Sequence, residues 1–342
     1  MPGMEMSLLR EVPPVHLSAR PRRGGVRWAL RRIRGYSQGV QAPPADKTEQ
    51  ALYGFAQPIL GMRVLLSDPE LLKEALYPAG LLAAACALYA TFGHEGAGWA
   101  AWFKTFYKAF AALAPLPSFF FANHYARLAA MIRWRMGFGA CGPREMPWRL
   151  LAGRMIRQAL IVLIGIAPLL ALAKALPAVG DVLSAAVLGL WSLHWVVADA
   201  FDDAQVCLPG ESVRQSIHRD RNAPEPWFVR WLRRAASHLP GILGSPIRLF
   251  ARICDKLAMD SRGEIAVMES NRAISAGFGL STAALLATPV LNLLFRPIII
   301  AGSSHLLGQI EKHEVQIQSI GPKSPSAAGP SEAETLTSAH AT

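Results

Sequence analysis

Long apolar stretches alternate with short arginine-rich segments along this chain of 342 residues. A helix that crosses the ~30 Å hydrocarbon core of a bilayer needs about 20 mainly apolar residues. Four stretches come close to this length, and we expect each to form a membrane-spanning helix: Ala75–Phe92, Ala109–Ile132, Gln158–Leu176 and Val182–Ala200. The pattern therefore predicts an all-α fold, that of a polytopic membrane protein.

Two of these stretches carry a further prediction. The second contains Pro115 and Pro117, so we expect it to be kinked, which a membrane helix tolerates. The third and fourth are separated by a very short connection and should form a tight antiparallel hairpin.

The last apolar region, Ala273–Gln309, is too long for one crossing. Its roughly 36 residues would make a helix of more than about 50 Å at ~1.5 Å per residue. Pro289 and Pro297 remove donors to the carbonyls of Leu285 and Leu293, so we expect the helix to break between the prolines. Two pieces of similar length would then form a partly penetrating hairpin, and two steep full crossings remain the alternative.

The charged and polar segments divide the rest of the chain. We expect a basic, partly disordered arm at residues 1–51, a membrane domain at 52–206, a cytoplasmic insertion at 207–264, the hairpin at 265–312 and a disordered tail at 313–342. The membrane domain should begin with an amphipathic helix, Gly54–Pro78, that is broken near Pro69 and leads into the first span.

The insertion contains two amphipathic patterns. In "IRLFARICDKLAM", Ile247, Phe250, Cys254 and Leu257 make one face, and the basic side chains repeat on another. The segment "PWFVRWLRRAASHL" combines tryptophans with arginines in a similar way. Such helices can lie in the membrane interface or pack on the cytoplasmic side of the protein itself, and both alternatives stay open.

Composition supports the membrane assignment. Only 17% of the residues are charged, against about 25% in typical soluble domains, and the mean hydropathy is +0.25. The net charge of +11 comes mainly from arginines beside the apolar stretches. At those positions anionic lipid headgroups are the expected partners, and nucleic acid is not.

The arginines also predict the topology. They gather in Arg20–Arg34, Arg133–Arg157 and Arg214–Arg234, whereas the two other loops hold few basic residues. Four crossings with the N-terminus inside place all three clusters in the cytoplasm, as the positive-inside rule requires.

The chain contains none of the common catalytic motifs. Walker, HExxH and GxSxG sequences are missing, and the four cysteines show no metal-ligand spacing. We therefore expect no enzyme activity, no cofactor and no metal site.

Three stretches are similar to a known family. "GFGLSTAALLATPVLNLLFRPIIIAGSSHLL" (Gly277–Leu307) resembles the C-terminal signature of the CysZ sulfate permeases and the related etoposide-induced membrane proteins, with Pro289, Pro297 and Gly302 among its matches. The segment around Pro69 and "WVVADAFDDA" (Trp195–Ala204) match other parts of that family. The resemblance covers about residues 52–206 and 265–312.

This resemblance implies partly penetrating hairpins, self-association and sulfate passage. In the permeases a Gly-Leu/Ile-Arg-Arg run associated with sulfate follows the first proline, whereas here Glu70 replaces the glycine and Lys73 alone keeps a positive charge. A passive pathway for sulfate or another small anion is therefore one hypothesis. A non-transporting membrane scaffold, which binds lipids or a partner protein, is the other.

Polar groups within the apolar stretches are the candidate pathway residues. They are Arg296, Asn292, Arg127, His124 and Lys73. Arg296 should pair with an anion, either Asp199 or a lipid phosphate, because an unpaired guanidinium in the bilayer is unfavourable by at least ~2.5 kcal/mol. For Arg127 the alternative is that its long side chain reaches the interface instead.

Overall fold

The computed structural model describes residues 25–93, 98–113, 120–287 and 292–320. These residues are almost entirely helical, which confirms the predicted all-α class. The only β structure among them is a two-residue ladder in which β1 (Gly142–Pro143) pairs antiparallel with β2 (Val206–Cys207).

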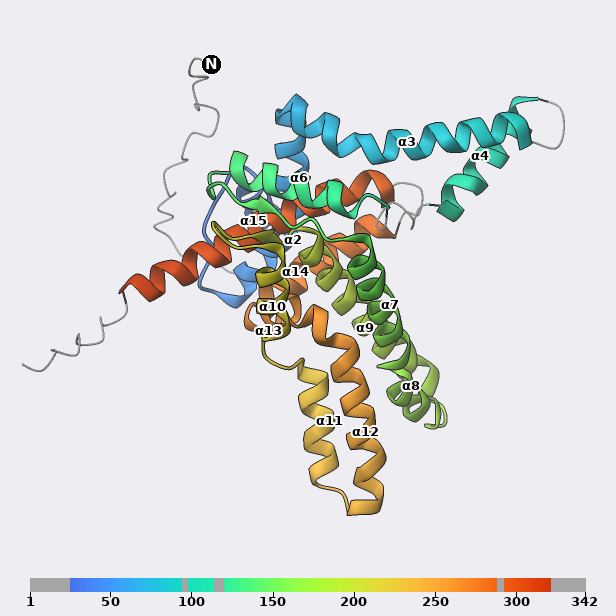
Figure 1. Ribbon diagram of the computed structural model, residues 1–342, viewed down its shortest axis with the longest axis vertical. Helices are drawn as coiled ribbons and strands as arrows, with labels where there is room; N and C mark the ends of the chain where they lie inside the picture. Colours follow the sequence, from blue (N-terminus) through green and yellow to red (C-terminus); the bar gives the residue numbers. More distant parts are fainter. Residues whose placement is uncertain (1–24, 94–97, 114–119, 288–291, 321–342) are drawn as a thin grey trace, which may run out of the picture.

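Three helical hairpins extend from a compact core (Figure 1). The first is formed by α3 (Pro69–Gly93) and α4 (Trp99–Leu113). The second combines α7 (Trp148–Ile164) and α8 (Ala167–Lys174) with α9 (Gly180–Asp203), and the third is α11 (Trp227–Ser237) with α12 (Gly241–Ala258). The first hairpin leaves the core in a different direction from the other two.

The core is built around α2 (Lys47–Ser67), which packs against both α14 (Arg272–Leu286) and α15 (Asn292–Ile320). Both helix contacts are close because each has a glycine where the backbones meet. A Cβ at Gly277 would collide with the carbonyl of Ala51, and one at Gly302 would lie 2.8 Å from the carbonyl oxygen of Gln57. The backbones of these helices therefore approach each other closely, as is typical of membrane helices that pack through small residues.

The helix α2 differs from the amphipathic helix that we expected there. Its side chains at Tyr53, Ala56 and Leu60 are buried, so it forms the centre of the fold. The predicted break near Pro69 is present: α2 ends at Ser67, and the Asp68 carboxylate accepts a bond of 2.9 Å from the Glu70 backbone N–H at the start of α3.

In the part of the chain that the structure describes, three segments are long and apolar enough to cross a membrane: α3, the α7–α8 pair and α9. Little of their apolar surface is covered by protein. Only 11% of the most apolar window of α7–α8 is buried, and 28% in each of the other two. Such large uncovered apolar surfaces are rare on soluble proteins and indicate contact with lipid.

The predicted second span, Ala109–Ile132, is not one continuous helix. It is divided between α4, which pairs with α3, and α6 (Ala122–Arg135), which packs against α15. Phe121, just before α6, has non-helical dihedral angles. The division surrounds Pro115 and Pro117, which lie outside the described residues, and two prolines this close disfavour an uninterrupted helix. The count of four spans is therefore not confirmed.

The C-terminal region is divided at the start of the expected Pro289–Pro297 region. The helix α14 ends at Leu286 and α15 begins at Asn292, so Pro297 lies inside α15 and not at the break. Pro289 lies outside the described residues. The two helices are also unequal, because α15 continues for 29 residues to Ile320 and includes the beginning of the segment predicted to be a disordered tail.

The remaining elements surround the core. The basic arm contributes α1 (Val26–Tyr36), which packs on α2. The insertion contains, besides its hairpin, α10 (Val213–Arg221), the short 3₁₀ helix η1 (Met259–Ser261) and α13 (Arg262–Ser270). As predicted, Cys254 on α12 is buried and Arg252 is exposed.

Candidate functional site

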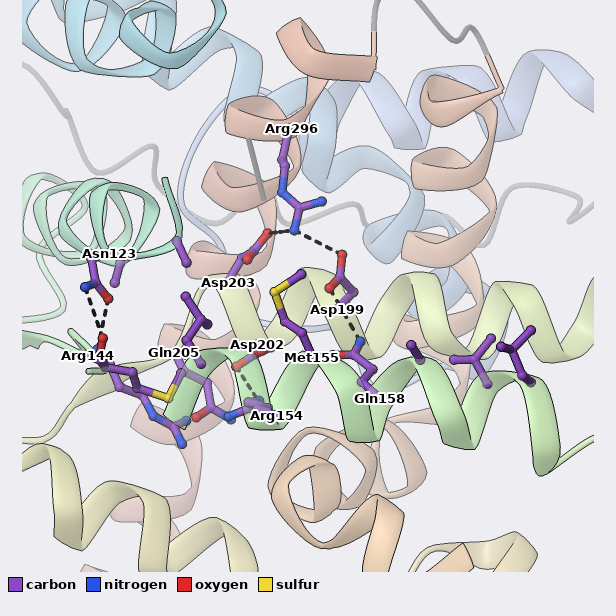
Figure 2. A pocket seen from close by; sticks show the side chains of 17 residues that line it. Asn123, Arg144, Arg154, Met155, Gln158, Asp199, Asp202, Asp203, Gln205 and Arg296 are labelled. Atoms are coloured by element: carbon purple, nitrogen blue, oxygen red, sulfur yellow. Dashed lines mark hydrogen bonds and ion pairs between the residues drawn. The ribbon is translucent and has the colours of Figure 1, made fainter. Parts of the chain in front are cut away.

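A cavity of about 440 Å³ lies where the hairpin of α7 and α9 joins the core. Its walls come from α6, the β1 region, α7, the C-terminal end of α9 and α15 (Figure 2). One side is apolar, with Val162 and Leu163 of α7. The polar side chains are Asn123, Arg144, Arg154, Gln158, Asp199, Asp202, Asp203, Gln205 and Arg296.

Arg296 is held by two carboxylates of α9. Its Nη2 lies 3.1 Å from Oδ2 of Asp199 and 2.7 Å from Oδ2 of Asp203. The two aspartates are four residues apart, so they project from the same face of the helix. Figure 2 shows them reaching the guanidinium together. The predicted partner Asp199 is thus confirmed, and Asp203 is a second one that we did not foresee.

Arg154 and Arg144 form a second group of charges. Arg154 contacts Asp202 at 2.7 Å and also bonds Glu264 of α13, while Arg144 lies 2.6 Å from Asp220 of α10. Both arginines are almost fully buried. Burial raises the pKa of Asp220 and that of Glu264, and the neighbouring guanidinium groups oppose this rise.

Several donors in the cavity wall have no acceptor. Among the described residues, the Nε groups of Arg144, Arg154 and Arg296 are buried without a hydrogen-bond partner. The same holds for Nη1 of Arg144. A buried donor without a partner is unfavourable by about 1–3 kcal/mol, more when charged. Guanidinium donors in this state can bind a small anion through charge-assisted hydrogen bonds.

A third set of ion pairs joins α7 to α10 and η1 outside the cavity lining. The Asp260 carboxylate accepts a bond of 2.7 Å from Nε of Arg221 and contacts Arg157 of α7. Burial would raise the pKa of Asp260, but the bonds and charges of the two arginines outweigh it and lower the pKa. Arg157 and Arg221 are therefore paired with a carboxylate of the protein.

The structure separates the predicted pathway residues. Arg296 lines the cavity, and the side chain of Asn292 lies outside what the structure describes. Arg127 is largely exposed and its Nε binds Glu145 at 2.5 Å, which fits the expected alternative for this residue. His124 bonds the carbonyl of Glu74 at 2.8 Å, and Lys73 is exposed on α3, so neither lines the cavity.

Sequence reasoning missed Arg144 and Arg154 among the residues that line the cavity. We used the two arginines only as markers of topology, although they are buried in the site. Asn123 holds the loop after β1 in place, because its amide bonds both the carbonyl (3.1 Å) and the N–H (2.9 Å) of Met146. The one available signal was the acidic run at the end of an apolar span, "ADAFDD", which needs cations nearby.

Comparisons with known proteins give no family assignment. The chain matches no protein-family model, no curated protein and no solved structure.

Proposed function

We propose that this protein is a multi-pass membrane protein that provides a passive pathway for a small anion, such as sulfate, as its resemblance to the CysZ permeases implies. The supporting observation is the arginine-lined cavity at the base of α7 and α9. The cavity of about 440 Å³ is bordered by guanidinium N–H groups that have no acceptor, those of Arg144, Arg154 and Arg296. That space is ample for one tetrahedral anion with some of its water.

The cavity lies at the polar ends of α7 and α9, so it would form one mouth of the pathway. Its apolar wall continues along α7 through Val162 and Leu163. An anion that enters would have to compete with Asp199 and Asp203 for Arg296. We therefore propose weak binding and rapid exchange, as a passive pathway needs, and no tight storage site.

We also propose that the protein resides in a bacterial inner membrane with its basic segments in the cytoplasm. Contacts between these segments support the proposal. Arg144, after α6, reaches Asp220 of α10, and Arg157 reaches Asp260, so two of the arginine clusters lie together. The first cluster is anchored nearby, because Arg32 of α1 pairs with Glu49 of α2 at 2.8 Å.

The second candidate is a membrane scaffold that transports nothing, working as a homo-oligomer or with a partner protein. Two observations favour it. Every cavity arginine already has a carboxylate partner, and Glu70, at the position where the permeases have glycine, binds Arg135 on the protein surface. The two functions differ in one measurable property, the passage of an anion.

Uptake of labelled sulfate into proteoliposomes that contain the purified protein tests the proposal. We expect uptake faster than in empty vesicles, and a large loss for Arg296→Ala. The matched control is Lys73→Ala, which removes a charge outside the cavity and should leave uptake unchanged. Wild-type uptake equal to that of empty vesicles would exclude sulfate passage and favour the scaffold.

A further inference from the structure

The α11–α12 hairpin belongs to the segment that has no counterpart in the family resemblance. Its two helices pack through small buried side chains, among them Ala236 on α11 and Ala251 on α12. It extends from the core in the same general direction as α7, α8 and α9 (Figure 1), and α12 contacts α7 directly. The hairpin is therefore adjacent to a segment that is apolar enough to cross a bilayer.

The tip of this hairpin is free of acidic and basic residues other than one histidine. Residues 235–247 read "AASHLPGILGSPI" and contain no Asp, Glu, Lys or Arg. Two of its apolar side chains face outward: Leu239 is exposed, and Ile242 is 89% exposed. A turn between two amphipathic helices in water would normally carry charges, so this tip is suited to an apolar environment.

Arginines border the tip on both helices. Arg234 precedes it on α11, and Arg248 and Arg252 follow it on α12; all three side chains are exposed. In the described part of the chain, none of the three has an ion-pair partner. Nearer the core the situation differs, because Arg230 pairs with Glu269 and Arg233 with Asp255. The arginines of this hairpin without a carboxylate partner are thus those nearest the apolar tip.

The dimensions match shallow insertion. From Gly241 to Arg248, α12 rises about 10 Å at ~1.5 Å per residue. Amphipathic elements that lie in the membrane interface bury their apolar side about 5–10 Å deep, while a full crossing needs ~30 Å. Arginines at this height would meet the phosphates of an anionic lipid surface.

We propose that the tip of the α11–α12 hairpin, residues 235–247, inserts into an anionic lipid interface, where Arg234, Arg248 and Arg252 bind the phosphates. This changes our view of the segment 207–264 from a cytoplasmic insertion to an additional membrane anchor. The proposal goes beyond the anion pathway and does not depend on it. Lipid is the occupant because the neighbouring α7 brings the bilayer to this side of the core.

Fluorescence quenching tests the insertion in the full-length protein. Ile242→Cys, in a Cys141→Ser background, is labelled with a small maleimide dye after reconstitution into phosphatidylcholine–phosphatidylglycerol vesicles. We expect quenching by lipids brominated on the acyl chain, and iodide quenching several-fold weaker than for the matched control Lys256→Cys. Lys256 is exposed on the same helix, beyond the arginines.

Two outcomes would overturn the insertion. Iodide quenching at Ile242 equal to that at Lys256, without an effect of brominated lipid, would place the tip in water. Protection from both quenchers would mean that protein, such as a second copy of the chain, covers the tip.

A second measurement tests the role of the arginines. In the triple variant Arg234→Gln, Arg248→Gln, Arg252→Gln, bromolipid quenching of the Ile242 label should fall at least twofold in anionic vesicles and change little in purely zwitterionic ones. An equal effect in both lipids would refute phosphate binding. Far-UV circular dichroism of each variant checks that the helices remain. We expect them to remain because the substituted side chains of the hairpin are all exposed.

Discussion

The guanidinium of Arg144 lies 2.6 Å from the carboxylate of Asp220, and both side chains are almost fully buried. This contact joins the loop after α6 to α10, two segments 76 residues apart in the chain. It also requires both segments to be on the same side of the membrane. The pair therefore bears both on the membrane topology of the chain and on the stability of its fold.

Removal of one partner should destabilise the fold strongly. We expect Arg144→Ala to lower the free energy of unfolding by about 3–5 kcal/mol, because Asp220 would remain buried without its cation. The control is Arg127→Ala, which breaks the exposed pair with Glu145 and should lower the free energy of unfolding far less, because solvent screens that pair. Chemical unfolding in detergent measures both, and equal losses would show that the Arg144 pair has no special role.

The close contact of α2 and α14 gives a second prediction. A Cβ at Gly277 would collide with the carbonyl of Ala51, so Gly277→Ala should lower the free energy of unfolding by about 1–3 kcal/mol. At Gly189 on α9 nothing lies within 4 Å of an added Cβ, and Gly189→Ala should raise helix stability by up to about 1 kcal/mol. Thermal unfolding in detergent compares them. Similar melting temperatures for the two variants would contradict the observed packing.

Much of the fold followed from the apolar pattern, because a bilayer limits the possible lengths of a helix. The ends of α3, α7–α8 and α9 were predicted within a few residues, but α3 begins 6 residues and α7 begins 10 residues before the predicted start. The apolar pattern did not predict the effect of Pro297, because the effect of a proline depends on its position in the helix. Pro297 lies in the second turn of α15 and removes one bond to the carbonyl of Leu293, yet the helix continues through it, as membrane helices tolerate.

The site was harder to predict, because its residues meet only in the folded chain. The partner of Arg296 could be inferred from the need to neutralise a buried cation, and Asp199 was the nearest acid in an apolar span. Arg154 and Arg144 belong to a loop whose basic residues fit the positive-inside rule, and composition cannot tell an arginine at the lipid surface from one inside the protein. Their burial depends on Asp220 and Glu264, far along the sequence.

Asp260 predicts a stability change at low pH. The contacts with Arg221 and Arg157 lower its pKa from the ordinary value of 3.8, so the ionised carboxylate stabilises the folded state. This contribution is complete above about pH 4 and disappears as the pH falls through the lowered pKa. The difference in free energy of unfolding between the wild type and Asp260→Asn should therefore shrink below pH 4. A difference that grows on acidification would mean that the pKa is raised.

The two carboxylates on Arg296 lead to the last prediction. Each ionised carboxylate beside Arg296 offsets its positive charge and repels an anion. Asp203→Asn removes one negative charge beside the guanidinium and keeps the shape of the side chain. If the cavity binds sulfate, its affinity should rise about tenfold, which corresponds to ~1.4 kcal/mol.

Equilibrium binding of labelled sulfate in detergent measures this change. Asp181→Asn, at the opposite end of α9, is the control and should change nothing. An unchanged or weaker affinity for Asp203→Asn would show that the anion does not approach Arg296, and the scaffold function would then be favoured.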